Sequence, residues 1–130
     1  MTVTVLCAWI FTVLSVLTIL FQIALAFGAP WGEFTMGGKH GGVLPGMWRL
    51  IPVVSTLILA GFIVIVLVRA GVILDDWKPL SHTLIWIVVG YSVLGCIANA
   101  ATPSPRERMI WLPVVIVLSA TSLNVALSAS

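Results

Sequence analysis

The sequence predicts an all-α fold, a bundle of four transmembrane helices arranged up-down-up-down. Three observations support it: the composition, four long segments without charged residues, and Pro, Gly and Trp at the ends of these segments. Of the 130 residues, 61% are hydrophobic and 8% are charged, whereas a soluble domain has about 25% charged residues. A soluble domain of this size cannot bury so much apolar surface, so we expect lipid to be the solvent.

The charge-free segments have the length of membrane-spanning helices, which need roughly 20 residues. We expect a single transmembrane domain over residues 1–130, with a long polar loop at 28–48. The predicted helices cover residues 3–27, 49–74, 81–101 and 109–128. Gly28 and Pro30 stop the first of them, and Pro103 and Pro105 stop the third. Four tryptophans lie at span ends, as an aromatic belt predicts: Trp31, Trp48, Trp77 and Trp111.

The basic residues predict the orientation of these helices. With four spans, the 28–48 loop and the 102–108 turn share one face, and the two termini share the other. The loop face carries Lys39, Arg49, Arg106 and Arg108, and the other face carries Lys78 and Arg69. The positive-inside rule therefore places the 28–48 loop in the cytoplasm and both termini outside.

The titratable residues of the long loop are Glu33, Lys39 and His40. Glu33 can act as a base, His40 can carry a proton near neutral pH, and Lys39 can hold an anion. The neighbouring glycines can direct backbone N–H groups at a phosphate, although the Walker spacing is missing. The alternative is a solvated interfacial loop whose charges pair with nearby arginines.

Two amide side chains, Gln22 and Asn99, lie near the loop-side ends of the first and third predicted helices. Polar groups in lipid face the interior of a bundle, so both can line a polar cavity under the loop. The alternative is direct helix–helix hydrogen bonding, worth about 0.6–2 kcal/mol per residue. Arg106 can bind lipid headgroups or the Glu33 carboxylate, or it can serve only as a topology anchor.

Arg69 lies near the end of the second predicted helix. A local ion pair with Asp75 or Asp76 is one interpretation, because the long side chain can reach the interface. Binding of an anionic ligand by a buried arginine is the other.

No metal or cofactor site is predicted. His40 and His82 are expected on opposite membrane faces, roughly 30 Å apart, so they cannot ligate one haem or metal together. Cys7 and Cys96 do not form a C-x-x-C pair, which argues against thiol exchange. No catalytic spacing such as H-E-x-x-H or G-x-S-x-G occurs.

Three segments of the chain resemble an uncharacterised family of small bacterial four-helix integral membrane proteins: residues 28–39, 69–73 and 99–113. The loop pattern G-A-P-W-G-E-x-T-M-G-G-K and the turn pattern T-P-S-x-x-E-R carry this resemblance. It covers nearly the whole chain and implies four helices, a loop and turn that belong together, and a bacterial inner membrane location. It implies no activity.

Three functions fit these observations. The first is a non-enzymatic module that handles a ligand, lipid or ion, or an accessory subunit, with its site under the 28–48 loop. The second is an interfacial enzyme acting on a lipid or isoprenoid, with Glu33 or His40 as acid or base. The third is a structural subunit of a larger membrane complex, bound through the small residues Ser122, Ala126 and Ser130. These residues can also pack against another helix, within the chain or in a homo-oligomer. Membrane lipids are the expected partners, and a net charge of +2 does not suggest nucleic acid.

Overall fold

A computed structural model describes residues 2–35 and 41–128. Within them all regular structure is helical, and four helices are long. The prediction of an all-α fold with four long helices is confirmed. The long helices are α1 (Val3–Ala26), α2 (Leu50–Arg69), α3 (Lys78–Ala101) and α4 (Pro105–Ala126). Short 3-10 segments lie between them: η1 (Gly32–Phe34), η3 (Gly46–Arg49) and η4 (Asp75–Trp77).

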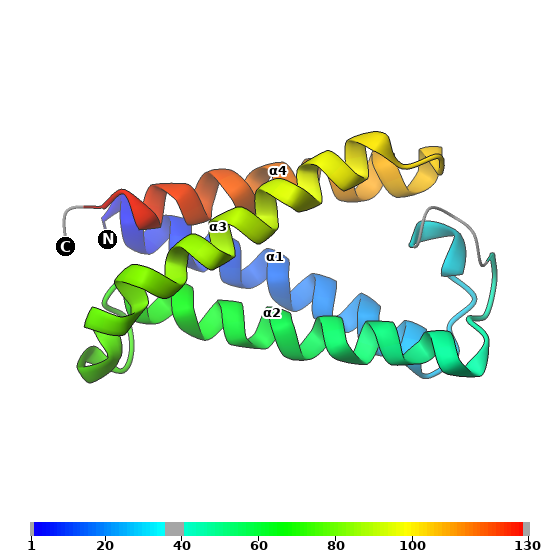
Figure 1. Ribbon diagram of the computed structural model, residues 1–130, viewed down its shortest axis with the longest axis horizontal. Coiled ribbons are helices and arrows are strands. Elements are labelled where there is room, and N and C mark those ends of the chain that lie inside the picture. The colour runs from blue at the N-terminus through cyan, green and yellow to red at the C-terminus, as the bar shows by residue number, and fades with distance from the viewer. Residues whose placement is uncertain (1, 36–40, 129–130) are drawn as a thin grey trace.

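The four long helices pack lengthwise (Figure 1). α1 contacts α2 and α4, and α3 contacts α4 and α2. Figure 1 shows both termini and the α2–α3 connection at one end, which we call the terminus end. The α1–α2 loop and the α3–α4 turn lie at the other end, which we call the loop end.

Glycines end α1 and α2 in the same way. Gly28 and Gly71 have φ of +103° and +80°, a region that side-chain-bearing residues avoid. After α2, the Gly71 N–H donates to the Val68 carbonyl and the Val72 N–H donates to the Leu67 carbonyl. This Schellman motif stops the helix. The predicted boundary at residue 74 therefore moves back to Arg69.

The starts of α3 and α4 also differ from the predicted boundaries. α4 begins at Pro105 instead of residue 109, because the Ser104 hydroxyl accepts a 3.2 Å hydrogen bond from the Glu107 N–H and caps the helix. Pro105 is thus a first-turn proline of α4 and does not terminate α3. α3 begins at Lys78 instead of residue 81, since η4 runs directly into it.

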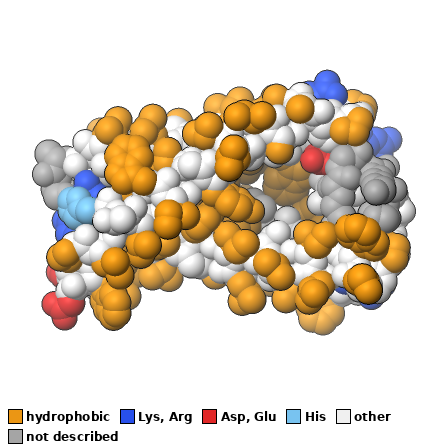
Figure 2. All heavy atoms as spheres, in the orientation of Figure 1, with side chains coloured by type: hydrophobic (Ala, Val, Ile, Leu, Met, Phe, Trp, Pro, Cys, Tyr) orange, Lys and Arg blue, Asp and Glu red, His pale blue; other side chains and the backbone are white. Residues whose placement is uncertain are grey.

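The surface of the bundle is largely apolar. The core contains Phe11, Phe62, Val66, Ile85 and Val88, yet many large apolar side chains on all four helices are exposed. Figure 2 shows hydrophobic side chains along the length of one face, with charged side chains near the two ends. In the described part of the chain, four helices are long and apolar enough to cross a membrane.

Arg69 is 2% exposed and joins α2 to the end of α4. Its Nη2 donates hydrogen bonds to the carbonyl oxygens of Ser128 (2.9 Å) and Ala126 (3.4 Å). Helix C-termini carry unsatisfied carbonyls and partial negative charge, which a guanidinium complements. Neither sequence interpretation of Arg69 included this contact.

Candidate functional site

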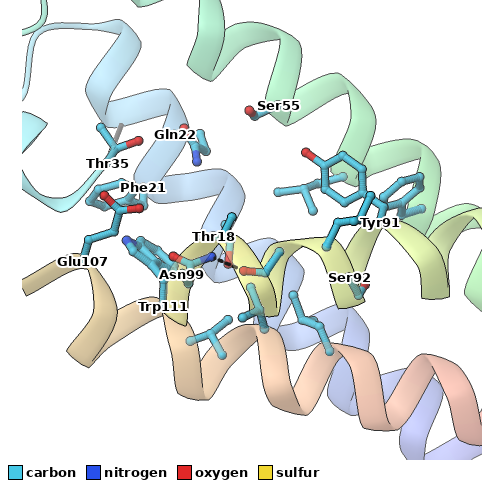
Figure 3. A pocket seen from close by; sticks show the side chains of 18 of the residues that line it. Thr18, Phe21, Gln22, Thr35, Ser55, Tyr91, Ser92, Asn99, Glu107 and Trp111 are labelled. Atoms are coloured by element: carbon cyan, nitrogen blue, oxygen red, sulfur yellow. Dashed lines mark hydrogen bonds between the residues drawn. The ribbon is translucent and has the colours of Figure 1, made fainter. Parts of the chain in front are cut away.

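A cavity of about 410 Å³ lies inside the bundle toward the loop end. Its wall comes from all four long helices, from Phe34 of η1 and from Thr35, which follows η1. The apolar wall residues are Phe11, Phe21, Phe34, Leu59, Phe62, Leu94, Gly95, Ala98, Trp111, Val114, Val115 and Leu118. The polar ones are Thr18, Gln22, Thr35, Ser55, Tyr91, Ser92, Asn99 and Glu107. Figure 3 shows these polar side chains around one space.

The amide and carboxylate groups of the wall lie at one end of the cavity, while hydroxyl groups such as those of Tyr91 and Ser92 lie farther along it (Figure 3). Gln22 comes from the last turns of α1, Asn99 from the last turn of α3, and Glu107 from the first turn of α4. Together with Thr35 they form the polar end of the cavity (Figure 3). The Asn99 amide Nδ2 donates a 2.7 Å hydrogen bond to the Gly95 carbonyl of its own helix, which fixes the side chain against α3.

Aromatic residues hold the loop against this polar end. Trp111 Nε1 donates a 2.7 Å hydrogen bond to the Phe34 carbonyl. Phe21 lies between two indoles: it stacks on Trp31 with ring centroids 5.9 Å apart and meets Trp111 edge-on at 4.8 Å. Such pairs contribute about 0.5–1.5 kcal/mol each beyond their buried area. The segment around η1 is therefore anchored to both α1 and α4.

The predicted site residues have different outcomes. Gln22 and Asn99 both lie on the cavity wall, and their role as ligand contacts stays a prediction. Arg106 is exposed in the first turn of α4. Glu33 belongs to η1, but its side chain lies outside the described residues.

Lys39 and His40 also lie outside the described residues, so the proposed chemistry of the loop stays a prediction. Ser122 and Ala126 of the small-residue stripe are buried within this chain, while Ser130 lies outside the description.

Several wall residues were not predicted, among them Thr18, Ser55, Tyr91 and Glu107. The pattern Ser104-x-x-Glu107 is a capping-box signature, and it could have placed Glu107 in the first turn of α4. Thr18 precedes Gln22 by one helical turn and shares its face, which the helical period also indicates.

Across the described residues, His, Cys, Asp and Glu do not gather in threes as a metal site would need. The chain matches no protein-family model, no curated protein and no solved structure. The resemblance carried by the loop and turn patterns stays a prediction.

Proposed function

We propose that this chain is an integral membrane protein that binds an amphipathic small molecule in the cavity without transforming it. In this proposal the four helices span a bacterial inner membrane in up-down-up-down order. The termini lie outside, and the 28–48 loop lies in the cytoplasm. The observation that carries the proposal is the cavity, which combines an apolar wall with a polar end.

The exposed side chains support the membrane part of this proposal. Residues such as Leu17, Leu57, Ile87 and Ile116 are more than half exposed, one on each long helix. Fully burying such a side chain is worth about 1.5–3 kcal/mol, so its exposed part would cost roughly 1–2 kcal/mol in water, and lipid removes that cost.

The cavity supports the ligand part. Its volume falls within the roughly 300–1,000 Å³ of small-molecule sites, which combine apolar walls with a few orienting polar groups. Glu107 is the one charged residue of the described wall, and the other polar groups there are amides and hydroxyls. Such groups orient a ligand by hydrogen bonds, which favours binding over acid–base chemistry.

A cavity-filling variant tests this function. Ala98 and Ala100 are both exposed residues of α3, but only Ala98 lines the cavity. The protein would be purified from bacterial membranes in mild detergent, and retained small molecules would be measured by native mass spectrometry. We expect wild type and Ala100→Phe to keep a bound molecule and Ala98→Phe to lose it. Equal retention in all three, or none in wild type, would refute the proposal.

A further inference from the structure

Two amide side chains offer hydrogen-bonding groups to a ligand at the polar end of the cavity. Asn99 Nδ2 donates to the Gly95 carbonyl, and because a carbonyl can only accept, the nitrogen of this amide must face Gly95. The Asn99 Oδ1 atom accepts no hydrogen bond from the described chain, so it is open as an acceptor. Gln22 is half-buried on α1, and its side chain makes no hydrogen bond to a described residue. It therefore offers both a donor and an acceptor.

The charges at this end do not favour an ionised headgroup. Glu107 is the one charged side chain of the described wall, and it already interacts with another group of the protein. A cationic headgroup would have to displace that interaction. An anionic headgroup would lose its water and meet no Lys or Arg among the described wall residues. The polar end therefore favours an uncharged head that forms hydrogen bonds.

The rest of the cavity has room for a single apolar chain. Its wall extends along α4 from Glu107 to Leu118 and along α1 from Gln22 back to Phe11. At ~1.5 Å per residue, each stretch is about 16 Å long. One leaflet of a bilayer has a similar depth, about half of a hydrocarbon core of roughly 30 Å. The volume of about 410 Å³ lies near the lower end of the range for small-molecule sites, which favours one chain over two.

The cavity is open to the surroundings of the bundle on its α3 side. Leu94 and Tyr91 line it and are nevertheless 66% and 47% exposed, so they face both the cavity and the outside. Figure 2 shows the hollow on this face, surrounded by hydrophobic side chains. With the helices spanning a membrane, this opening faces the acyl chains of the bilayer. The membrane itself is therefore the source of ligand that the opening favours.

We infer that the ligand is a membrane lipid with one apolar chain and an uncharged hydroxyl head, the chemistry of a long-chain or isoprenoid alcohol. Its hydroxyl donates a hydrogen bond to Asn99 Oδ1 and accepts one from Gln22 Nε2, since both amides border the same end of the cavity (Figure 3). The chain lies along the apolar wall. This inference rests on the proposed function and specifies its ligand class.

The donated hydrogen bond is tested in nanodiscs that contain equal amounts of oleyl alcohol and oleyl methyl ether, which lacks the hydroxyl proton. After extraction, native mass spectrometry gives the ratio of the two on the protein. We expect wild type to favour the alcohol about five-fold, the scale of one hydrogen bond. Asn99→Leu, which keeps the size of the side chain, should bring the ratio near one. Ser92→Ala removes a wall hydroxyl that is already bonded to the Val88 carbonyl and should keep the wild-type ratio.

Further mixtures test the second amide, the charge of the head and the type of chain. Gln22→Met should reduce the retention of alcohol and ether equally, because the ether oxygen also accepts a hydrogen bond. Oleylamine is cationic at pH 7, and wild type should favour oleyl alcohol over it. Geranylgeraniol and its methyl ether repeat the first measurement, and the alcohol that is retained more distinguishes a linear from an isoprenoid chain.

The two levels of the proposal fail differently. If wild type retains no small molecule, the proposed function fails together with this inference. If wild type retains a molecule that Ala98→Phe loses, the function stands. This inference is then overturned by a wild-type ratio near one for both alcohol and ether pairs, by a preference for the amine, or by an unchanged ratio in Asn99→Leu. The wild-type ratios need no variant, so they decide the inference even if Asn99→Leu fails to fold.

Discussion

The indole of Trp111 and the backbone carbonyl of Phe34 are joined by a 2.7 Å hydrogen bond, although the residues are 77 positions apart. The bond connects the second turn of α4 to the segment that follows α1. Phe21 packs against the same indole (Figure 3). Because Phe34, Phe21 and Trp111 all line the cavity, this contact fixes the position of its polar end.

Replacing Trp111 by Phe should loosen the loop and leave the bundle folded. The ring contact with Phe21 is largely kept, while the hydrogen bond is lost at a cost of about 1 kcal/mol. Amides in residues 32–35 should then exchange with deuterium roughly five-fold faster in nanodiscs. The matched control is Trp86→Phe, a half-exposed tryptophan on α3. Equal exchange of this segment in both variants would contradict the role given to Trp111.

Arg69→Met should weaken the last turn of α4. The variant removes the donor to the Ser128 and Ala126 carbonyls, and a hydrogen bond to a charged group contributes about 1.5–3 kcal/mol. We expect faster amide exchange over residues 122–128 and a lower thermal midpoint. Lys78→Met removes a basic residue at the same end that does not bond these carbonyls. It should therefore change the amide exchange of residues 122–128 less than Arg69→Met does. Unchanged exchange in Arg69→Met would show that the contact does not stabilise α4.

Gly71→Ala and Gly61→Ala should change stability in opposite directions. Gly71 has φ of +80°, and a Cβ there would lie 3.3 Å from Lys78 Nζ, so alanine should destabilise the turn by about 1–2 kcal/mol. Gly61 lies inside α2 with no heavy atom within 4 Å of a Cβ, so alanine should stabilise the helix by up to about 1 kcal/mol. Thermal midpoints in one detergent measure both variants. A loss of stability in Gly61→Ala would show that the glycine serves packing.

The sequence was sufficient for features that depend on local chemistry. Charge-free runs of about 20 residues indicated the four helices, and Gly28 marked the end of the first. The boundaries of α2 and α4 differ from those that hydrophobicity predicts, because two local features decide them: the left-handed conformation of Gly71 and the helix-capping hydroxyl of Ser104.

The cavity was only partly predictable. Gln22 and Asn99 were recognised because an amide in an apolar helix is conspicuous. Most of the wall consists of residues found anywhere in a membrane helix, such as Leu59 and Val114, so their position follows only from how the helices cross. The partner of Arg69 could not be predicted either, since it lies 57 to 59 residues away and is a backbone carbonyl with no sequence signature.

The proposed orientation becomes stronger when Arg69 is considered in its structural setting. Its guanidinium is buried and donates to the carbonyls at the end of α4. Among the described residues, this leaves Lys78 as the basic residue at the surface of the terminus end. The loop end carries Arg49, Arg106 and Arg108. This difference predicts that the loop end faces the cytoplasm.

Single-cysteine labelling in intact cells measures this orientation. Cys7 and Cys96 would first be replaced by alanine, since both are free thiols. Asp76→Cys and Val43→Cys then report the two ends, because both positions are exposed. A membrane-impermeant maleimide should label Asp76→Cys in intact cells and Val43→Cys only after the inner membrane is permeabilised. The reverse pattern would place the termini inside, and labelling of both in intact cells would contradict a bundle that crosses the membrane between these two positions.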